Sequence, residues 1–224
     1  MSRTFSTTIP CPGCGKSLDL EGYDSVNADR HPDLRAAILD GSLQQFSCEC
    51  GATFRGAPEF SYLDGGRRQW IAAHPYSEFN NYAEHDAATQ ELFDSALGEG
   101  APAVAQEIGA EISPRVVFGW GALREKIYLR EQGLEDADVE CLKLQLFKSN
   151  GLMPEAGQEM RLVEVADGQL RFGLFEAESE KALSGCEVPR AAYDEVVANR
   201  DGYAPLREPL LAGCWVDCQK LFYG

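Results

Sequence analysis

The chain has 224 residues, of which 44% are hydrophobic and 25% are charged, a composition typical of a globular protein with one sizeable core or two to three smaller ones. It contains no apolar run of about 20 residues and no signal-peptide core near its N-terminus, so we expect a cytoplasmic protein without membrane contact. Its formal net charge of −16 disfavours nucleic acid as the main partner.

This charge is distributed unevenly. Residues 1–75 carry 7 Lys and Arg against 9 Asp and Glu, whereas residues 76–224 carry 13 against 27. The negative field of the second part repels phosphate backbones and attracts basic surfaces. We therefore expect the acidic part to dock a protein partner, and a basic one in particular.

The region up to about residue 75 has the pattern of short strands joined by turns. Strands are predicted over 16–21, 43–47, 53–55, 60–63 and 69–72. The segment HPDLRAAILDG interrupts them. Pro32 is tolerated in a first helical turn, Leu34 and Ile38 have helical spacing, and Gly41 is a stop signal, so we predict a helix inserted into a β unit.

From Tyr82 onwards the pattern is mainly helical. Helices are predicted over 84–97, 101–112, 122–132 and 136–148, and the run RVVFGWG predicts a short buried strand between the second and the third of them. The acidic residues of these helices lie on the polar faces, where we expect them to be solvated. Asn150-Gly151 and the MPEAGQ that follows predict a linker.

The last part of the chain has the pattern of a small α+β unit. The run RLVEVADGQLRFGLF predicts a β-hairpin that turns at Asp167-Gly168. A helix is predicted over 190–199, directly after Pro189. The final CWVDCQKLFYG is predicted to be a strand.

Two cysteine pairs carry the clearest chemical signal. Cys11 and Cys14 belong to CPGCG, Cys48 and Cys50 belong to CECG, and a glycine directly follows each pair. That glycine is typical of a rubredoxin-like knuckle. In such a knuckle a tight turn points backbone N–H groups at the thiolates, and the residue after the second cysteine, here the glycine, takes a positive φ. A redox CxxC would instead stand at the start of a helix, whereas the residues after Cys14 alternate like a strand.

Two knuckles on two hairpins predict a zinc ribbon. Thiolates from Cys11, Cys14, Cys48 and Cys50 would form a closed tetrahedral site for one structural Zn²⁺, with no position left for water or substrate. Because CxC is one residue shorter than the usual CxxC, two alternatives stay open: His31 in place of Cys50, and thiols without a metal.

The predicted organisation is an α+β fold in three regions. Residues 1–75 form a zinc-ribbon-like β-hairpin unit with an inserted helix, residues 76–150 form a mainly helical region continuous with it, and residues 151–224 form a small α+β unit. Outside the two pairs, Cys141 lies on an apolar helix face and is predicted to be buried. Cys186, Cys214 and Cys218 lack a glycine knuckle, so we favour core packing there, although a second metal site stays open.

Several segments together resemble one known family. They are TTIPCPGCG, YDSVN, HPDLRAAILDGSLQQFSCECG and RVVFGWGALREKIYLREQGL. The chain is similar over about residues 5–150 to the bacterial CpXC family, which is named for its Cys-Pro-any-Cys motif. The resemblance implies a zinc-ribbon-like domain with a helical continuation and metal-ligand roles for Cys11, Cys14, Cys48 and Cys50. It implies no activity, and the second pair, CEC, departs from the family motif.

Catalytic motifs are missing from the sequence. His31, His74 and His85 lie outside any HExxH, and there is no GxSxG, GxxxxGK or GxGxxG. We therefore expect that the protein is not an enzyme. The alternative is a cysteine-dependent enzyme in which folding brings Cys214 or Cys218 to His74 or His85.

These observations favour a cytoplasmic, non-enzymatic zinc-ribbon adaptor that docks a protein partner through acidic surfaces. A toxin-neutralising protein of the immunity type would use the same features. The alternative binding function is that of a nucleic-acid regulator, in which Arg55, Arg67 and Arg68 would contact phosphates. The sequence does not determine the partner or the oligomeric state.

Overall fold

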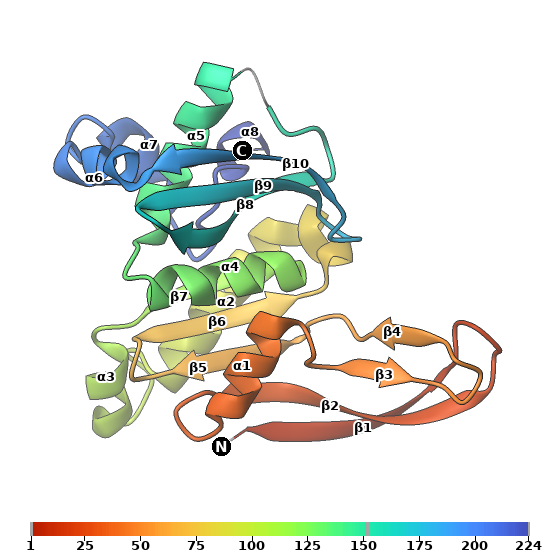
Figure 1. Ribbon diagram of the computed structural model, residues 1–224. Coiled ribbons are helices and arrows are strands. Elements are labelled where there is room, and N and C mark those ends of the chain that lie inside the picture. Colours follow the sequence, from red (N-terminus) through yellow and green to blue (C-terminus); the bar gives the residue numbers. More distant parts are fainter. Residues whose placement is uncertain (1, 151–152, 224) are drawn as a thin grey trace.

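The computed structural model describes residues 2–150 and 153–223 and has a mixed α+β fold (Figure 1). The strands are β1 (Arg3–Pro10), β2 (Ser17–Asn27), β3 (Gln45–Ser47), β4 (Thr53–Arg55), β5 (Phe60–Asp64), β6 (Gln69–His74), β7 (Ser113–Phe118), β8 (Gln158–Ala166), β9 (Gln169–Glu176) and β10 (Ala182–Pro189). The helices are α1 (Pro32–Asp40), the 3-10 helix η1 (Tyr76–Asn81), α2 (Tyr82–Ala96), α3 (Ala103–Gly109), α4 (Gly119–Glu131), α5 (Asp136–Asn150), α6 (Arg190–Ala198), α7 (Ala204–Leu211) and α8 (Lys220–Tyr223). Among the described residues, no helix is both long and apolar enough to cross a membrane.

The largest sheet has the strand order β1-β2-β5-β6-β7. β1 and β2 form a long antiparallel ribbon, and β5 and β6, which match the strands predicted over 60–63 and 69–72, form a hairpin around Gly65-Gly66. The pairs β2–β5 and β6–β7 are parallel. The sheet therefore continues past residue 75 in sequence, because its last strand follows α2 and α3. The short hairpin of β3 and β4 is a separate sheet beside the ribbon.

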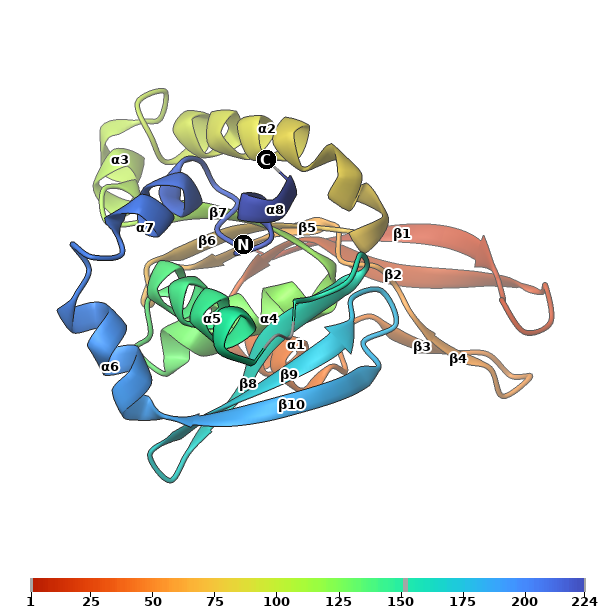
Figure 2. The same cartoon turned by 90° about the horizontal axis from the view of Figure 1, so that it is seen from above.

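Strand β6 is buried on both faces and separates two hydrophobic cores. Ile71 and Ala73 belong to the core with α1 and α4, whereas Trp70 and Ala72 belong to the core with α2 and the C-terminal segment. Successive side chains of a strand point to opposite faces, so this alternation fits a central strand covered on both sides. Figure 2 shows α2 and α3 on one side of the sheet and α1 and α4 on the other.

Helix α4 connects the two halves of the molecule. It lies between the five-stranded sheet and a three-stranded sheet with the order β10-β9-β8 (Figure 1). Its Leu123 and Ile127 pack under the large sheet, and its Leu129 joins a third core formed with α5, β8, β9 and α6. The predicted hairpin turn is present, and Asp167 and Gly168 both have positive φ, as a two-residue turn of type I′ requires.

The predicted strand at the C-terminal end is wrong. Residues 214–217 have no regular secondary structure, and α8 follows them. The Cys214 carbonyl accepts a hydrogen bond from the Val116 N–H, the Cys214 N–H donates to the Asp86 carboxylate, and Lys126 donates to the Val216 carbonyl. These partners come from β7, α2 and α4. The backbone groups that a sheet would satisfy are thus satisfied mainly by side chains.

The prediction that the acidic residues of α4 and α5 are solvated is also wrong for several of them. Glu125, Asp138 and Glu140 are buried, and so is Lys143. The helix faces assigned to solvent are covered by β8, by α7 with the loop before it, and by the C-terminal segment, which supply their hydrogen-bond partners. The predicted linker includes residues 151 and 152, which lie outside the described residues.

Candidate metal centre

The turn between β1 and β2 forms the first cysteine knuckle. The Cys11 N–H donates to the Lys16 carbonyl, and the Gly15 N–H donates to the Cys11 carbonyl, each at 2.8 Å, which closes a loop around Cys14. Gly15 has a φ of +74°, the positive value predicted at this position. The Gly13 N–H donates to the Cys11 sulfur at 3.3 Å, and such a hydrogen bond favours the thiolate.

The turn between β3 and β4 repeats this construction with one residue less. The Cys48 N–H donates to the Ala52 carbonyl, and the Gly51 N–H donates to the Cys48 carbonyl, each at 2.9 Å. Gly51 has a φ of +87°. Each of these two hydrogen bonds spans one residue fewer than its counterpart in the first knuckle. The CxC spacing is therefore accommodated by a tighter loop, which still brings Cys50 to the other three cysteines.

The four sulfurs meet where the two hairpin tips lie side by side (Figure 1). Cys11 Sγ lies 3.7 Å from Cys50 Sγ, Cys14 Sγ lies 3.7 Å from Cys48 Sγ, and all four ligand atoms lie within 4.8 Å of one another. A disulfide bond would need a distance of about 2.05 Å between two sulfurs. Four sulfurs at about 2.3 Å from a tetrahedral ion lie about 3.8 Å apart, so the group fits a metal ion with this coordination. His31 is not a member of the group.

At Cys11 the local structure also favours the thiolate form that a metal needs, whereas the pKa of Cys48 is raised. Burial raises the pKa of the Cys11 thiol, but hydrogen bonds from the Cys14 and Gly13 N–H groups outweigh it and lower the pKa to about 6. Gly13 has a second role, because a Cβ at this position would lie 2.8 Å from the Ala52 side chain of the other knuckle. The two knuckles can approach each other only where one of them lacks a side chain.

The remaining cysteines are thiols in or beside the cores. Cys141, Cys214 and Cys218 are buried, as the sequence predicts for core packing, and Cys186 is half-buried. Burial raises the pKa of Cys141 to about 11 and that of Cys214 to about 11. Burial also raises the pKa of Cys218 well above its usual value. These thiols stay protonated at neutral pH and are poor nucleophiles.

A second group of metal-ligating side chains consists of Glu140, Asp217 and Cys218, whose ligand atoms lie within 4.8 Å of one another. Cys186 and Cys214 are not part of it. The Lys143 ammonium donates to Glu140 Oε1 at 3.0 Å and to Glu125 Oε2 at 2.9 Å. Lys143 therefore already supplies the positive charge that a second ion would bring.

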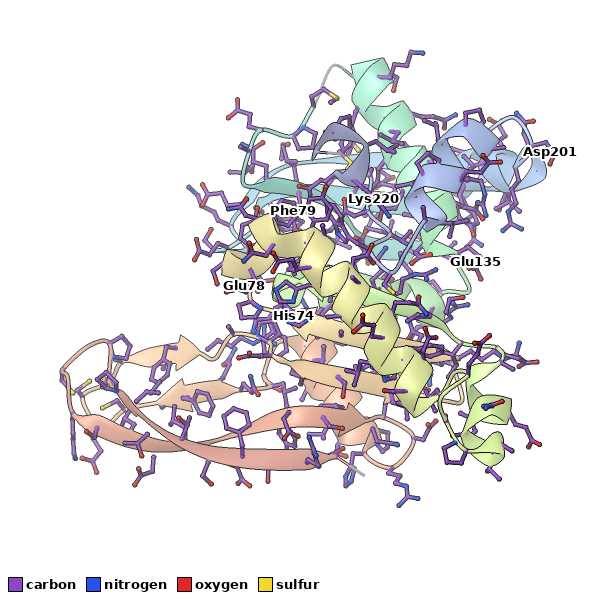
Figure 3. The ribbon with its side chains drawn as sticks, turned by 180° about the vertical axis from the view of Figure 1, so that it is seen from behind. His74, Glu78, Phe79, Glu135, Asp201 and Lys220 are labelled. Carbon is purple, nitrogen blue, oxygen red and sulfur yellow. The ribbon has the colours of Figure 1, made fainter. Side chains whose placement is uncertain are left out.

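The two histidines of the enzymatic alternative contact each other. The His74 and His85 rings have centroids 4.0 Å apart, and His85 Nε2 lies 3.5 Å from Glu78 Oε2. Figure 3 shows His74 and Glu78 close together, with Phe79 beside Glu78. The Cys214 thiol donates to the Gln90 side chain, at 3.5 Å. Within the described part of the chain, no thiol is hydrogen-bonded to an imidazole.

The buried position of His74 predicts a pH-dependent stability. Burial, followed by the charge of His85, lowers the pKa of His74 to about 4, against which Glu78 acts. Between about pH 6.5 and pH 4 the unfolded chain binds more protons at this position than the folded chain, so stability falls as the pH is lowered through this range.

We expect His74→Gln to lose less unfolding free energy than the wild type between pH 7 and pH 5, measured by urea denaturation. His31→Gln, at an exposed histidine, is the control and should match the wild type. An unchanged pH dependence in His74→Gln would contradict this assignment.

The arginines of the nucleic-acid alternative are each paired with a carboxylate. Arg67 lies 3.5 Å from an oxygen of Asp64, Arg68 2.8 Å from one of Glu111, and Arg55 3.8 Å from one of Glu180. Arg55 also lies over the Trp120 ring, at 3.7 Å. Arg67 and Arg68, paired in this way, present little free positive charge to a phosphate backbone.

Comparison with known families gives one match. A family model described as CpXC protein matches residues 9–143, a range that holds all four clustered cysteines, the strands from β2 to β7 and helix α4. The chain has no significant match among curated proteins or among solved structures. The match covers more than half of the chain and includes both knuckles. The chain therefore belongs to the CpXC protein family.

Proposed function

We propose that this protein is a cytoplasmic, non-enzymatic adaptor in which the four clustered cysteines hold one structural zinc ion and an acidic helical surface docks a basic protein partner. Four thiolates at tetrahedral spacing are the donor set that zinc takes in structural sites. Such a site has no open position, so the ion would cross-link the two hairpin tips and take no part in chemistry.

The observation that carries the docking proposal is the charge of the layer formed by α2 and α3. Residues 69–114 contain eight Asp and Glu and no Lys or Arg. Glu84, Glu91, Glu99 and Glu107 are exposed and form no ion pair within the described ranges. Glu111 is paired with Arg68, but the unpaired carboxylates create a local negative field, which attracts a basic surface and accelerates its association.

The same helices expose aliphatic side chains between the carboxylates. Leu92 is 52% exposed, Val104 72% and Ile108 50%. Carboxylates interspersed with aliphatic groups suit a basic amphipathic partner, which gains charge pairing and apolar burial from one contact. A toxin-neutralising protein that covers a basic toxin would use this surface.

Neutralising two of the unpaired carboxylates tests the proposal. We expect Glu84→Gln combined with Glu91→Gln to weaken binding of a fluorescent Lys- and Leu-rich amphipathic peptide of about 20 residues by about tenfold, at roughly 0.7 kcal/mol per charge. Raising the NaCl concentration from 50 to 500 mM should weaken wild-type binding, because exposed charges are screened. Fluorescence anisotropy measures both effects.

The matched control removes two exposed carboxylates elsewhere. Asp167→Asn with Glu195→Gln changes the net charge equally, and asparagine tolerates the positive φ of position 167. Equal weakening by both double variants would show that net charge alone attracts the peptide. That result, or affinity that is insensitive to salt, would contradict docking on α2 and α3.

A further inference from the structure

Three arginines lie around one carboxylate where the β3–β4 hairpin, α4 and the three-stranded sheet meet. Arg161 Nη1 lies 3.1 Å from Glu180 Oε1, Arg55 Nη1 lies 3.8 Å from Glu180 Oε2, and Arg124 also pairs with Glu180. Three cations around one anion are unexpected in a chain with a net charge of −16. Burial, followed by the charge of Arg124, lowers the pKa of Arg55 to about 10, which fits mutual repulsion among the guanidiniums.

The N–H donors of these guanidiniums outnumber the hydrogen-bond acceptors around them. Nη2 of Arg55 and Nη2 of Arg161 are buried without a hydrogen-bond partner among the described residues. The Arg161 side chain is only 6% exposed, and its guanidinium lies so close to Gly121 of α4 that any Cβ there would collide with it. A buried donor without a partner is costly, and a missing ion is one of its explanations.

A second carboxylate, that of Glu159, lies beside this cluster but does not neutralise a second arginine. Glu159 Oε1 lies 3.1 Å from Arg161 Nε. Burial raises the pKa of Glu159 to about 8, so this group is largely protonated at neutral pH. Glu180 is then the anion that the three arginines share, and Asp40 adds a weaker negative charge near Arg55.

A cavity of about 370 Å³ adjoins the cluster and gives access to it. Arg55 and Glu180 line it, together with Trp120, Gly119, Glu178 and other residues of the segments 56–58, 75–77 and 177–179. Arg124 and Arg161 instead line a second cavity, of about 360 Å³. The volume of the first cavity falls in the range that holds a small organic ligand. α4 begins at this cavity without a side-chain cap, so the positive end of its dipole adds to the field of the arginines.

We propose that this cavity binds a small oxyanion, a carboxylate or a phosphate, on the guanidinium of Arg55, and that Glu180, which can remain paired with Arg124 and Arg161, is the internal carboxylate with which the ligand competes. Bidentate arginine donors fit both groups. Glu180 is suited to be displaced, because it lies on the short loop between β9 and β10, has a φ of +58° and remains 26% exposed.

Removing the competing charge distinguishes an anion site from a structural clamp. We expect Glu180→Gln to bind inorganic phosphate about tenfold more tightly than the wild type does, measured by calorimetry at constant ionic strength. In chloride this variant should melt at a lower temperature than the wild type. Phosphate at 20 mM should then raise its melting temperature by an amount on the order of 4 °C, whereas equivalent chloride should not.

Two further arms complete the test. Arg55→Gln in the wild-type background should abolish phosphate binding, so the result does not depend on Glu180→Gln being stable. Acetate in place of phosphate reports whether a carboxylate is the better ligand. Equal and weak effects of phosphate and chloride on the wild type and both variants would overturn the proposal and leave Glu180 as a structural clamp.

Discussion

Replacing Cys11 by serine should abolish metal binding and disorder both hairpin tips while most of the molecule remains folded. The three hydrophobic cores contain none of the knuckle residues. β1 is exposed along nearly its whole length, and β3–β4 is a separate two-stranded sheet whose aromatic pair, Phe46 and Phe54, lies outside the three cores. Such hairpins are marginal alone, so the cross-link through sulfur is expected to stabilise the tips by several kcal/mol.

Elemental analysis and hydrogen exchange measure this effect. The wild type should hold about one equivalent of zinc, and the variant close to none. Amides in residues 9–19 and 45–55 should exchange roughly a hundredfold faster in the variant, whereas those of β5 and β6 should change little. Cys186→Ser, at a cysteine outside the cluster, is the control and should retain the metal. Metal retention in Cys11→Ser, or global unfolding, would contradict the proposed local role.

Replacing Lys143 by methionine should be the most destabilising single change in the helical region. Lys143 is 1% exposed and binds Glu125 and Glu140. Glu125 accepts the Leu162 N–H of β8 at 2.6 Å, and Glu140 accepts the Cys218 N–H at 3.0 Å. Removing the ammonium leaves the buried Glu125 without an ion pair and leaves Glu140 with Lys126 alone, at 3.5 Å, at an expected cost of about 3–5 kcal/mol and a fall in Tm on the order of 10 °C.

Thermal and urea denaturation test this expectation. Lys148→Met makes the same substitution at an exposed lysine of the same helix and should change stability by less than about 0.5 kcal/mol. Glu125→Gln added to Lys143→Met should restore part of the loss, because the uncompensated charge is removed. Equal stability of Lys143→Met and Lys148→Met would show that the buried network contributes little.

The network around Lys143 shows where helical periodicity fails as a guide to burial. Apolar residues mark the face of α5 that packs on the nearest neighbour, and the opposite face was expected to be in solvent. Asp138 and Glu140 lie on covered faces instead, because Arg200, Arg207 and the Cys218 backbone arrive there from residues 60 or more positions away. Nothing local to α5 distinguishes a carboxylate paired in this way from a solvated one.

The prediction of a strand in the C-terminal segment was wrong for a related reason. Cys214, Trp215 and Val216 are apolar and consecutive, which favours a buried strand in the absence of other information. In the fold they fill a space between α2, β7 and α4, where Asp86 and Lys126 satisfy the backbone. A segment becomes a strand only when a neighbouring strand edge is available to it.

The sequence alone predicted the two knuckles and the four cysteines that the structure brings together. These features depend on local requirements: a glycine with positive φ after each pair, and cysteines a few residues apart on either side of a tight turn. Only the tertiary structure decided which charged side chains are buried, where the C-terminal segment lies, and that Arg55, Arg124 and Arg161 share Glu180. Those outcomes depend on contacts between distant segments, whose free energies leave no periodic or spaced signal in the sequence.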